Sequence, residues 1–350
     1  MSNYWNLQRQ IVIEGGSSGI AWPATAELRL ELQPCDLFGV PSTSFPRTTI
    51  KGKTEFVVNG LTGKLSVSAS QPVDQAIFHG TYPNGVIRIE GNIVHLTAQL
   101  ADWSWLENTL NWLSTALTQF LSVQVGVFVD VALVEGTISG RSLRALYPAE
   151  SYSLIVACVD EQTRDAAIRT SLLGPAQNQS SYPRFVASAS YFRHALRLLS
   201  PREVNYAPYV VYAEVLLNLA KCVEILVSGK DREDQKKKFR EFGFTKEQIE
   251  TVIMPIICIR NDLDVAHPTS GYRTKEEIAV LRKFVDRTVK NVSHLLRLIS
   301  RQIAVKSDFL EPLPSLPSGK RSKLIKKLES YLANEELDPA STTPVVLSAD

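Results

Sequence analysis

The sequence lacks long apolar runs and an N-terminal export signal. No uninterrupted apolar stretch reaches about 18 residues, the length that a membrane-spanning helix requires. The first residues, MSNYWNLQRQIVIEGG, have no basic region followed by an apolar stretch, so they do not predict a secretory signal. We therefore expect a cytoplasmic protein that has no membrane partner.

Cysteine is scarce as well. The four cysteines, Cys35, Cys158, Cys222 and Cys258, are far apart, and no CxxC or paired His/Cys motif exists. This distribution predicts reduced thiols rather than a disulfide framework, and it argues against a structural zinc site. The glycine-rich stretches lack the spacing of a phosphate-binding or dinucleotide-binding loop. We expect neither a metal nor a cofactor.

The chain has little net charge, +2, but that charge is unevenly distributed. Residues 1–150 hold 9 Lys/Arg against 12 Asp/Glu, a balance of −3, whereas residues 184–306 hold 22 against 14, a balance of +8. A basic second half suits an anionic partner such as RNA. It is also compatible with a surface charge that only maintains solubility.

Residues 1–174 are predicted to form a β-rich domain. Alternating apolar and polar residues between Gly, Pro and Asn turn signals predict strands at 26–33, 53–60, 63–70, 85–91, 92–100, 123–136 and 152–160. Among them, ADWSWLENTLNWLSTALTQFL predicts one amphipathic helix with Asp102 as its N-cap. The Gly/Pro/Ser-rich residues 174–183 end this domain, to which we assign a sensing or interaction role.

Beyond this break the apolar period changes to that of a helix. Helices are predicted at 184–199, 208–228, 231–241, 245–267 and 274–304, and the last begins with TKEE, a capping box. Four long helices with short connections predict an antiparallel bundle over 184–306. Residues 307–350 predict a proline-rich linker, a short basic helix and a flexible tail. The predicted fold class is α+β, an N-terminal β-rich domain followed by an all-α bundle of four or five helices.

The stretch IRNDLDVAHP, residues 259–268, concentrates polar groups directly after the apolar run VIMPIICI. On a helix, Arg260 and His267 are seven residues apart and lie within about 20° of one face, with Asp264 about 40° from Arg260. Pro268 bars continuation of the helix and places His267 at or just past its end.

These residues allow three interpretations: a site for RNA cleavage, a solvated helix end and a metal site. A histidine that titrates near neutrality transfers protons, and a guanidinium holds a phosphate and stabilises its developing charge. Together they suffice for metal-independent RNA cleavage, in which the 2′-hydroxyl attacks the adjacent phosphate. The stretch also fits a solvated helix end with an Asp–Arg pair. A metal site built from Asp262, Asp264 and His267 is disfavoured, because the two aspartates lie on different helix faces.

The motif and its helical setting resemble the HEPN (higher eukaryotes and prokaryotes nucleotide-binding) family. RNDLDVAH matches that family's signature, in which an arginine and a polar residue are followed, after four to six intervening residues, by a histidine; here these are Arg260, Asn261 and His267. A preceding helix, YAEVLLNLAKCVEIL, carries Glu224 in a similar setting, and 274–304 corresponds to the family's final long helix. The resemblance covers residues 184–304.

The resemblance implies roles for these residues. Arg260 would bind and polarise the scissile phosphate, His267 would act as general acid and base, and Asn261 would position the helix end or the phosphate. Asp264 and Glu224 would support them. Family members usually form homodimers through the bundle, so that two motifs face one shared cleft. For Glu224, pairing with a nearby lysine is an equal alternative to orienting Arg260.

The resulting hypothesis is an endoribonuclease, a toxin or antiviral-defence effector regulated by its N-terminal domain. Its partners would be RNA, such as tRNA or mRNA, a second copy of the chain, and an antitoxin or trigger protein on the N-terminal domain. Arg193, His194 and Arg197 are weaker candidates for an RNA-binding face. The alternative is a catalytically inactive HEPN module used for dimerisation or for binding nucleotides or RNA.

Overall fold

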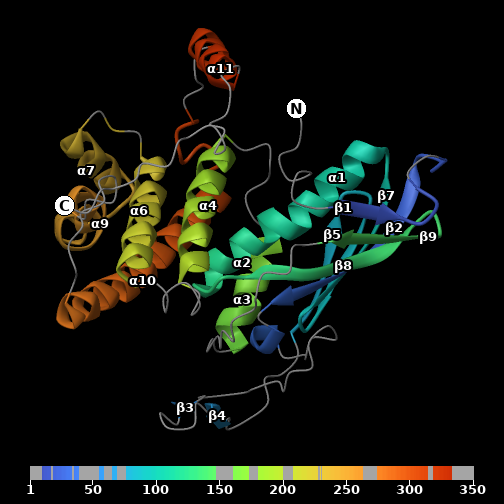
Figure 1. Cartoon of the computed structure of the whole chain (residues 1–350), viewed down its shortest axis with the longest axis horizontal. Helices are drawn as coiled ribbons and strands as arrows, with labels where there is room; N and C mark the ends of the chain where they lie inside the picture. Colours follow the sequence, from blue (N-terminus) through green and yellow to red (C-terminus); the bar gives the residue numbers. More distant parts are fainter. Residues whose placement is uncertain are drawn as a thin grey trace, which may run out of the picture. The chain divides into compact units, whose positions relative to one another are not determined.

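The protein has an α+β fold, as predicted, in which an antiparallel sheet is followed by a mainly helical region (Figure 1). The chain divides into two units, Met1–Glu311 and Pro312–Asp350. A computed structural model describes residues 10–16, 19–33, 35–38, 55–58, 65–68, 76–146, 161–172, 180–199, 208–227, 229, 231–262, 274–313 and 318–332.

The main sheet has seven antiparallel strands in the order β1-β9-β8-β2-β7-β6-β5. The strands are β1 (Gln10–Ile13), β2 (Ala24–Gln33), β5 (Ile77–Tyr82), β6 (Gly85–Glu90), β7 (Ile93–Leu100), β8 (Asp130–Ile138) and β9 (Arg141–Leu146). The strands β3 (Glu55–Val58) and β4 (Leu65–Ser68) form a separate two-stranded antiparallel sheet, and η2 (Cys35–Phe38) is a short 3₁₀ turn. The predicted strands that became β2, β3, β4, β6 and β7 are confirmed, whereas β1, β5 and β9 were not predicted.

Alternation along the strands gives the sheet one buried face. In β2, Ala24, Ala26 and Leu28 are buried, whereas Thr25 and Glu27 between them are exposed. The same alternation in β7 buries Leu96 and exposes the residues on either side. Side chains of successive strand residues point to opposite faces, so the apolar face forms a core and the other face carries polar side chains.

One long helix covers the apolar face and also reaches the helical region. It comprises α1 (Trp103–Asn111), the π-helical turn η3 (Trp112–Leu117) and α2 (Thr118–Val125). The Asp102 carboxylate accepts a hydrogen bond from Trp105 N at 2.9 Å and caps its start, as predicted. A row of fully buried leucines packs into the sheet core: Leu106, Leu110, Leu113, Leu117 and Leu121. Phe120 and Val123 belong instead to the core of the helical region.

The predicted strand at 123–136 was wrong at its start. Residues 123–125 continue α2, and Gly126 ends the helix in the left-handed conformation with φ 71°. Val123 is helical despite its β propensity because it is fully buried in the helical core, and tertiary packing outweighs intrinsic propensity. The strand β8 begins only at Asp130. The predicted strand at 152–160 lies outside the described residues.

The second half of the unit is helical, as predicted. Its helices are α3 (Glu161–Leu172), α4 (Tyr182–Leu198), α6 (Pro208–Leu226), α7 (Arg232–Glu241), α8 (Lys246–Gln248), α9 (Met254–Asp262) and α10 (Lys275–Val305), and a π-helical turn η4 (Ile249–Ile253) joins α8 to α9. The helix α3 was not predicted. In the unit that starts at Pro312, the predicted basic helix is α11 (Ser318–Leu332).

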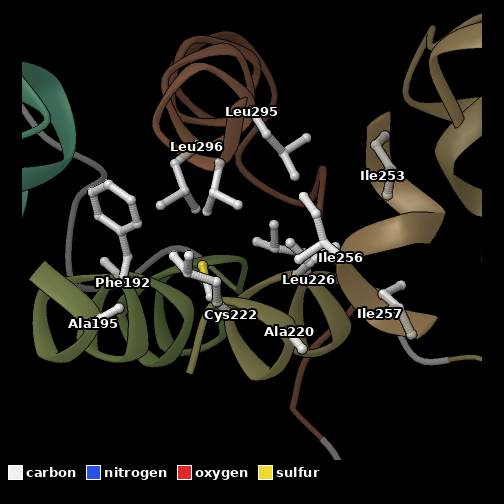
Figure 2. Close-up of a cluster of buried hydrophobic side chains, with 14 of the residues drawn as sticks. Phe192, Ala195, Ala220, Cys222, Leu226, Ile253, Ile256, Ile257, Leu295 and Leu296 are labelled. Atoms are coloured by element: carbon white, nitrogen blue, oxygen red, sulfur yellow. The ribbon is translucent and has the colours of Figure 1, made fainter. Parts of the chain in front are cut away.

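The helices α4, α6, α9 and α10 share one apolar core. Figure 2 shows Ile256 of α9 beside Leu226 of α6, with Leu295 and Leu296 of α10 above them. The predicted capping box of α10 is present, since Thr274 Oγ1 accepts from Glu277 N at 3.2 Å and Thr274 N donates to the Glu277 carboxylate at 2.8 Å.

Polar contacts also join the sheet region to the helices. Gln119 Nε2 of α2 donates to Ser190 Oγ of α4 at 2.7 Å, and Ser293 Oγ of α10 donates to the Val123 carbonyl at 2.9 Å. The long helix therefore packs against both cores and hydrogen-bonds to two helices of the second.

Candidate active site

The motif arginine lies in the last turn of α9, a helix whose other turns are built into the core. Within α9, Met254, Ile256 and Ile257 are buried, and Figure 2 shows Ile256 and Ile257 on the side that faces α6. The helix packs against α6, and both belong to the same apolar cluster. The sequence VIMPIICI therefore forms the buried face that its apolar character predicts.

Position 260 continues this core-facing side. It follows Ile256 by four residues and Ile257 by three, so all three positions lie on one side of α9. The helical pattern predicts another apolar residue at position 260, but the residue there is an arginine.

The remaining motif residues are only partly described. Asn261 and Asp262 follow Arg260 in the final turn of α9. Asp264, His267 and Pro268 lie outside the described residues. The predicted alignment of Arg260 with His267 on one helix face therefore stays a prediction.

Glu224 lies near the end of α6, the helix that packs against α9. Its side chain is half-buried, and it stands between Cys222 and Leu226, which are both core residues. This position is compatible with either predicted role of Glu224, because it lies on the helix that adjoins the motif helix.

The three residues proposed as an RNA-binding face on α4 have different surroundings. Arg193 is turned toward the sheet region: its guanidinium donates to the Val129 carbonyl at 3.1 Å and to Asp130 Oδ1 at 2.7 Å, and it lies 4.6 Å from the centre of the Phe128 ring. His194 and Arg197 are both exposed. The structure thus gives Arg193 a structural role at the start of β8 and leaves the other two on the surface.

His194 lies in a polar cluster between α4 and α6 that the sequence reading did not identify. Partial burial lowers the pKa of His194, the nearby charges of Arg197 and Lys221 lower it further, and Glu214 opposes them. The Lys221 ammonium lies 5.8 Å from the centre of the Tyr191 ring. The three-residue spacing of positions 191, 194 and 197 on α4 was the available signal, because it places them on one helix face.

The thiol of Cys222 cannot serve as a nucleophile in the folded protein. It is fully buried, and burial raises its pKa to about 12, although the hydroxyl of Ser188, 3.2 Å away, opposes this rise. A thiol that stays protonated is unreactive.

The described residues provide neither a cluster of metal ligands nor a membrane-spanning helix. No group of three or more His, Cys, Asp or Glu side chains in the described part of the chain is placed to hold a metal ion. Within the same residues, no helix has both the length and the apolar character needed to cross a membrane.

Comparison of the chain with family models, with curated proteins and with solved structures found no match.

Proposed function

We propose that the protein is a metal-independent endoribonuclease of the HEPN type that acts in the cytoplasm. In this proposal it is a toxin or antiviral-defence effector whose N-terminal sheet region receives the regulatory signal. The assignment rests on the motif residues Arg260, Asn261 and His267 in the sequence and on the position of Arg260 and Asn261 in the last turn of α9.

The observation that carries the proposal is the arginine at the next core-facing position of α9. Ile256 and Ile257 are 2% and 3% exposed, and position 260 lies on the same side one turn later. The backbone of residue 260 belongs to α9 rather than to a loop, and sites on rigid elements hold their geometry well. In the proposed mechanism its guanidinium binds a substrate phosphate.

The reaction needs a phosphate clamp and proton transfer but no protein nucleophile. The ribose 2′-oxygen attacks the adjacent phosphorus, a new O2′–P bond forms, and the P–O5′ bond breaks. His267 takes the proton of the 2′-hydroxyl or gives one to the leaving 5′-oxygen, while Arg260 stabilises the charge on the phosphate oxygens. The products carry a 2′,3′-cyclic phosphate and a 5′-hydroxyl.

A homodimer would complete the site. One motif supplies one histidine, whereas removing a proton from the 2′-hydroxyl and protonating the leaving oxygen are two separate tasks. Two motifs meeting at one phosphate would divide these tasks between the subunits, with Asn261, Asp264 and Glu224 holding the helix end in position.

The test compares RNA cleavage by the wild-type protein, Arg260→Ala and His267→Ala in the presence of EDTA. We expect the wild type to cleave RNA without a metal and to leave 2′,3′-cyclic phosphate ends. Each variant should lose at least about 100-fold in rate, the contribution typical of a general acid–base group or an oxyanion donor.

Matched controls separate this loss from general damage. Arg240→Ala removes an exposed arginine from α7, and His79→Ala removes an exposed histidine from β5. Both controls should cleave at the wild-type rate. Cleavage that survives both motif substitutions would disprove the site. If the wild type cuts no RNA but forms a dimer and binds a nucleotide, the inactive binding module is the better assignment.

A further inference from the structure

The outer side of α10 carries a row of basic residues, which we call the α10 stripe. Its members are Lys283, Arg287, Lys290, His294, Arg297 and Arg301. Gaps of four, three, four, three and four residues place all six within an arc of about 80° at about 100° per residue. The stripe extends for about 27 Å along the helix at 1.5 Å per residue.

The stripe lies opposite the side of α10 that packs in the core. The core side includes Val285, Val292, Leu296, Ile299 and Ile303, which are at most 1% exposed. All members of the stripe are exposed except Arg297, which is half-buried. Because its apolar side is fully used within the protein, α10 cannot insert that side into a lipid surface as an amphipathic membrane helix does.

Within the described part of the chain, the stripe has few acidic neighbours. Among the described residues, no ion pair joins Lys283, Arg287, Lys290, Arg297 or Arg301 to a carboxylate, and Arg297 Nε is buried without an acceptor. Between residues 278 and 305 the sequence holds six Lys/Arg and one acidic residue, Asp286, which lies near Tyr212 of α6.

Two lysines of α7 are paired with carboxylates. Lys236 of α7 lies 2.8 Å from Glu233 and 3.0 Å from Glu250, and Lys238 lies 2.9 Å from Glu311. Neighbouring like charges at three-residue and four-residue spacing destabilise a helix. Asp286, three residues after Lys283 and four before Lys290, is the one acidic residue at such a spacing from the stripe between residues 278 and 305. The row of like charges is therefore a net stability cost, which an anionic ligand would offset.

We infer that the α10 stripe binds the backbone of single-stranded RNA, the substrate of the endoribonuclease proposed above. A straight row of cations matches a linear polyanion, because each Lys or Arg can neutralise one phosphate and release its counterions. The stripe contains no aromatic side chain on which a base could stack, so binding depends on the phosphates and not on the sequence. The inference rests on the proposed function only for the choice of RNA as the anion.

The test measures binding of a fluorescent single-stranded RNA of about 20 nucleotides, 2′-O-methylated throughout. Without a free 2′-hydroxyl this probe cannot be cleaved, so binding is measured separately from catalysis. The stripe variant is Arg287→Gln/Lys290→Gln/Arg301→Gln, and the control is Arg232→Gln/Lys237→Gln/Arg240→Gln on α7. Both variants remove three exposed cations.

We expect the stripe variant to lose at least about tenfold in affinity. Its slope of log affinity against log salt concentration should become shallower by about 2, at about 0.7 per phosphate contact on a single strand. The α7 control should stay within about twofold of the wild type, because phosphate contacts are local. Equal losses in both variants would mean attraction by total charge and would overturn the inference, as would unchanged binding by the stripe variant. Thermal unfolding of both variants verifies that they are folded.

Two further outcomes separate this inference from the proposed function. If binding depends on the stripe but the wild type does not cleave unmodified RNA, RNA binding by the stripe is supported and the endoribonuclease assignment is wrong. If the wild type and the stripe variant cleave unmodified RNA at equal rates and neither binds the probe, the endoribonuclease assignment stands and RNA binding by the stripe is wrong. If poly-glutamate binds in a stripe-dependent way and RNA does not, the partner is an acidic polypeptide and the RNA inference fails.

Discussion

The outward face of the sheet and the outward face of α10 both carry many charges, but they arrange them differently. The strand register places residues of five neighbouring strands, β9, β8, β2, β7 and β6, in one transverse row: Arg144, Glu135, Arg29, His95 and Arg88. In this row Arg29 Nη1 donates to Glu135 Oε1 at 2.7 Å, and Arg88 pairs with Glu90 of its own strand. The α10 stripe has basic residues alone.

The two arrangements of charge differ in their effects on stability and on the attraction of anions. Cross-strand pairs of opposite charge stabilise a sheet and cancel each other's field at a distance. A row of one sign does the reverse, since it destabilises its own helix slightly and attracts anions. The polar face of the sheet thus needs no charged partner, whereas the α10 stripe does.

The largest loss of stability is expected from a substitution in α2, the helix that packs in both the sheet core and the helical core. Phe120 of α2 stacks on Phe185 of α4 with ring centres 6.0 Å apart, in the helix whose leucines cover the sheet. Phe120→Ala should lower the free energy of unfolding by about 3–5 kcal/mol, because it leaves a cavity. Val305→Ala, at a residue 87% exposed, should change it by less than about 0.5 kcal/mol.

The same experiment tests whether the regions unfold together. All five tryptophans precede residue 113, so fluorescence follows the sheet region, whereas circular dichroism at 222 nm follows mainly the helices. Coincident denaturation curves are expected, because α2 is part of both cores. Two separate transitions would show that the shared helix does not couple them.

A smaller effect should distinguish two arginines of α4. Arg193→Ala removes the contacts to Val129 and Asp130 and should lower the free energy of unfolding by about 2–3 kcal/mol, as expected for a hydrogen-bonded charge. Arg197→Ala on the exposed side should change it by less than about 0.5 kcal/mol. Urea denaturation measures both. Equal effects would contradict the assignment of Arg193 to a structural contact.

The two charged faces should respond to neutralisation with opposite sign. Glu135→Gln breaks the pair with Arg29 and should lower the free energy of unfolding by about 0.2–1 kcal/mol. Arg287→Gln relieves repulsion from Lys283 and Lys290 and should raise it by about 0.2–0.5 kcal/mol. Denaturation at low salt measures both changes, and high salt should reduce them. If both substitutions change the free energy of unfolding in the same direction, the proposed difference between the two charged faces is wrong.

The smallest effect concerns the pH dependence of His194. Its pKa is lowered in the folded protein, so between that value and about 6.5 the unfolded chain binds more protons. The stability contribution is therefore present above this window and is lost as the pH falls through it. A titration by NMR should place His194 below a histidine in a short peptide. Arg197→Gln should raise its pKa, because a neighbouring positive charge is removed, and an unchanged pKa would rule out that cause.

Much of the architecture followed from periodicity, and the failures have identifiable causes. The strands β2 and β7 were predicted because one of their faces is buried in a regular alternation. The edge strand β5 was missed because none of its residues is fully buried, so its apolar pattern is weak. The strand β1 has only four residues, too few for a periodic pattern.

Part of the candidate site was also predictable. The sequence indicated that Arg260 follows a buried helical run, and the structure places it in the last turn of α9. The role of Arg193 was not predictable, because its partners at 129 and 130 are 64 and 63 residues away in the chain. The α10 stripe was readable as a spacing of basic residues, but only the packing of α10 shows that this side is free of the core.

By itself the sequence determined the α+β class, the capped start of α10, the capped start of the long helix and the basic character of the second half, because all of these depend on local patterns of residues. Tertiary structure alone decided that α2 packs between two cores and that residues 123–125 are helical. It also decided that Arg193 binds the start of β8, and that charges are paired on the sheet but not along the α10 stripe. These features depend on which distant residues meet, and no local pattern encodes that.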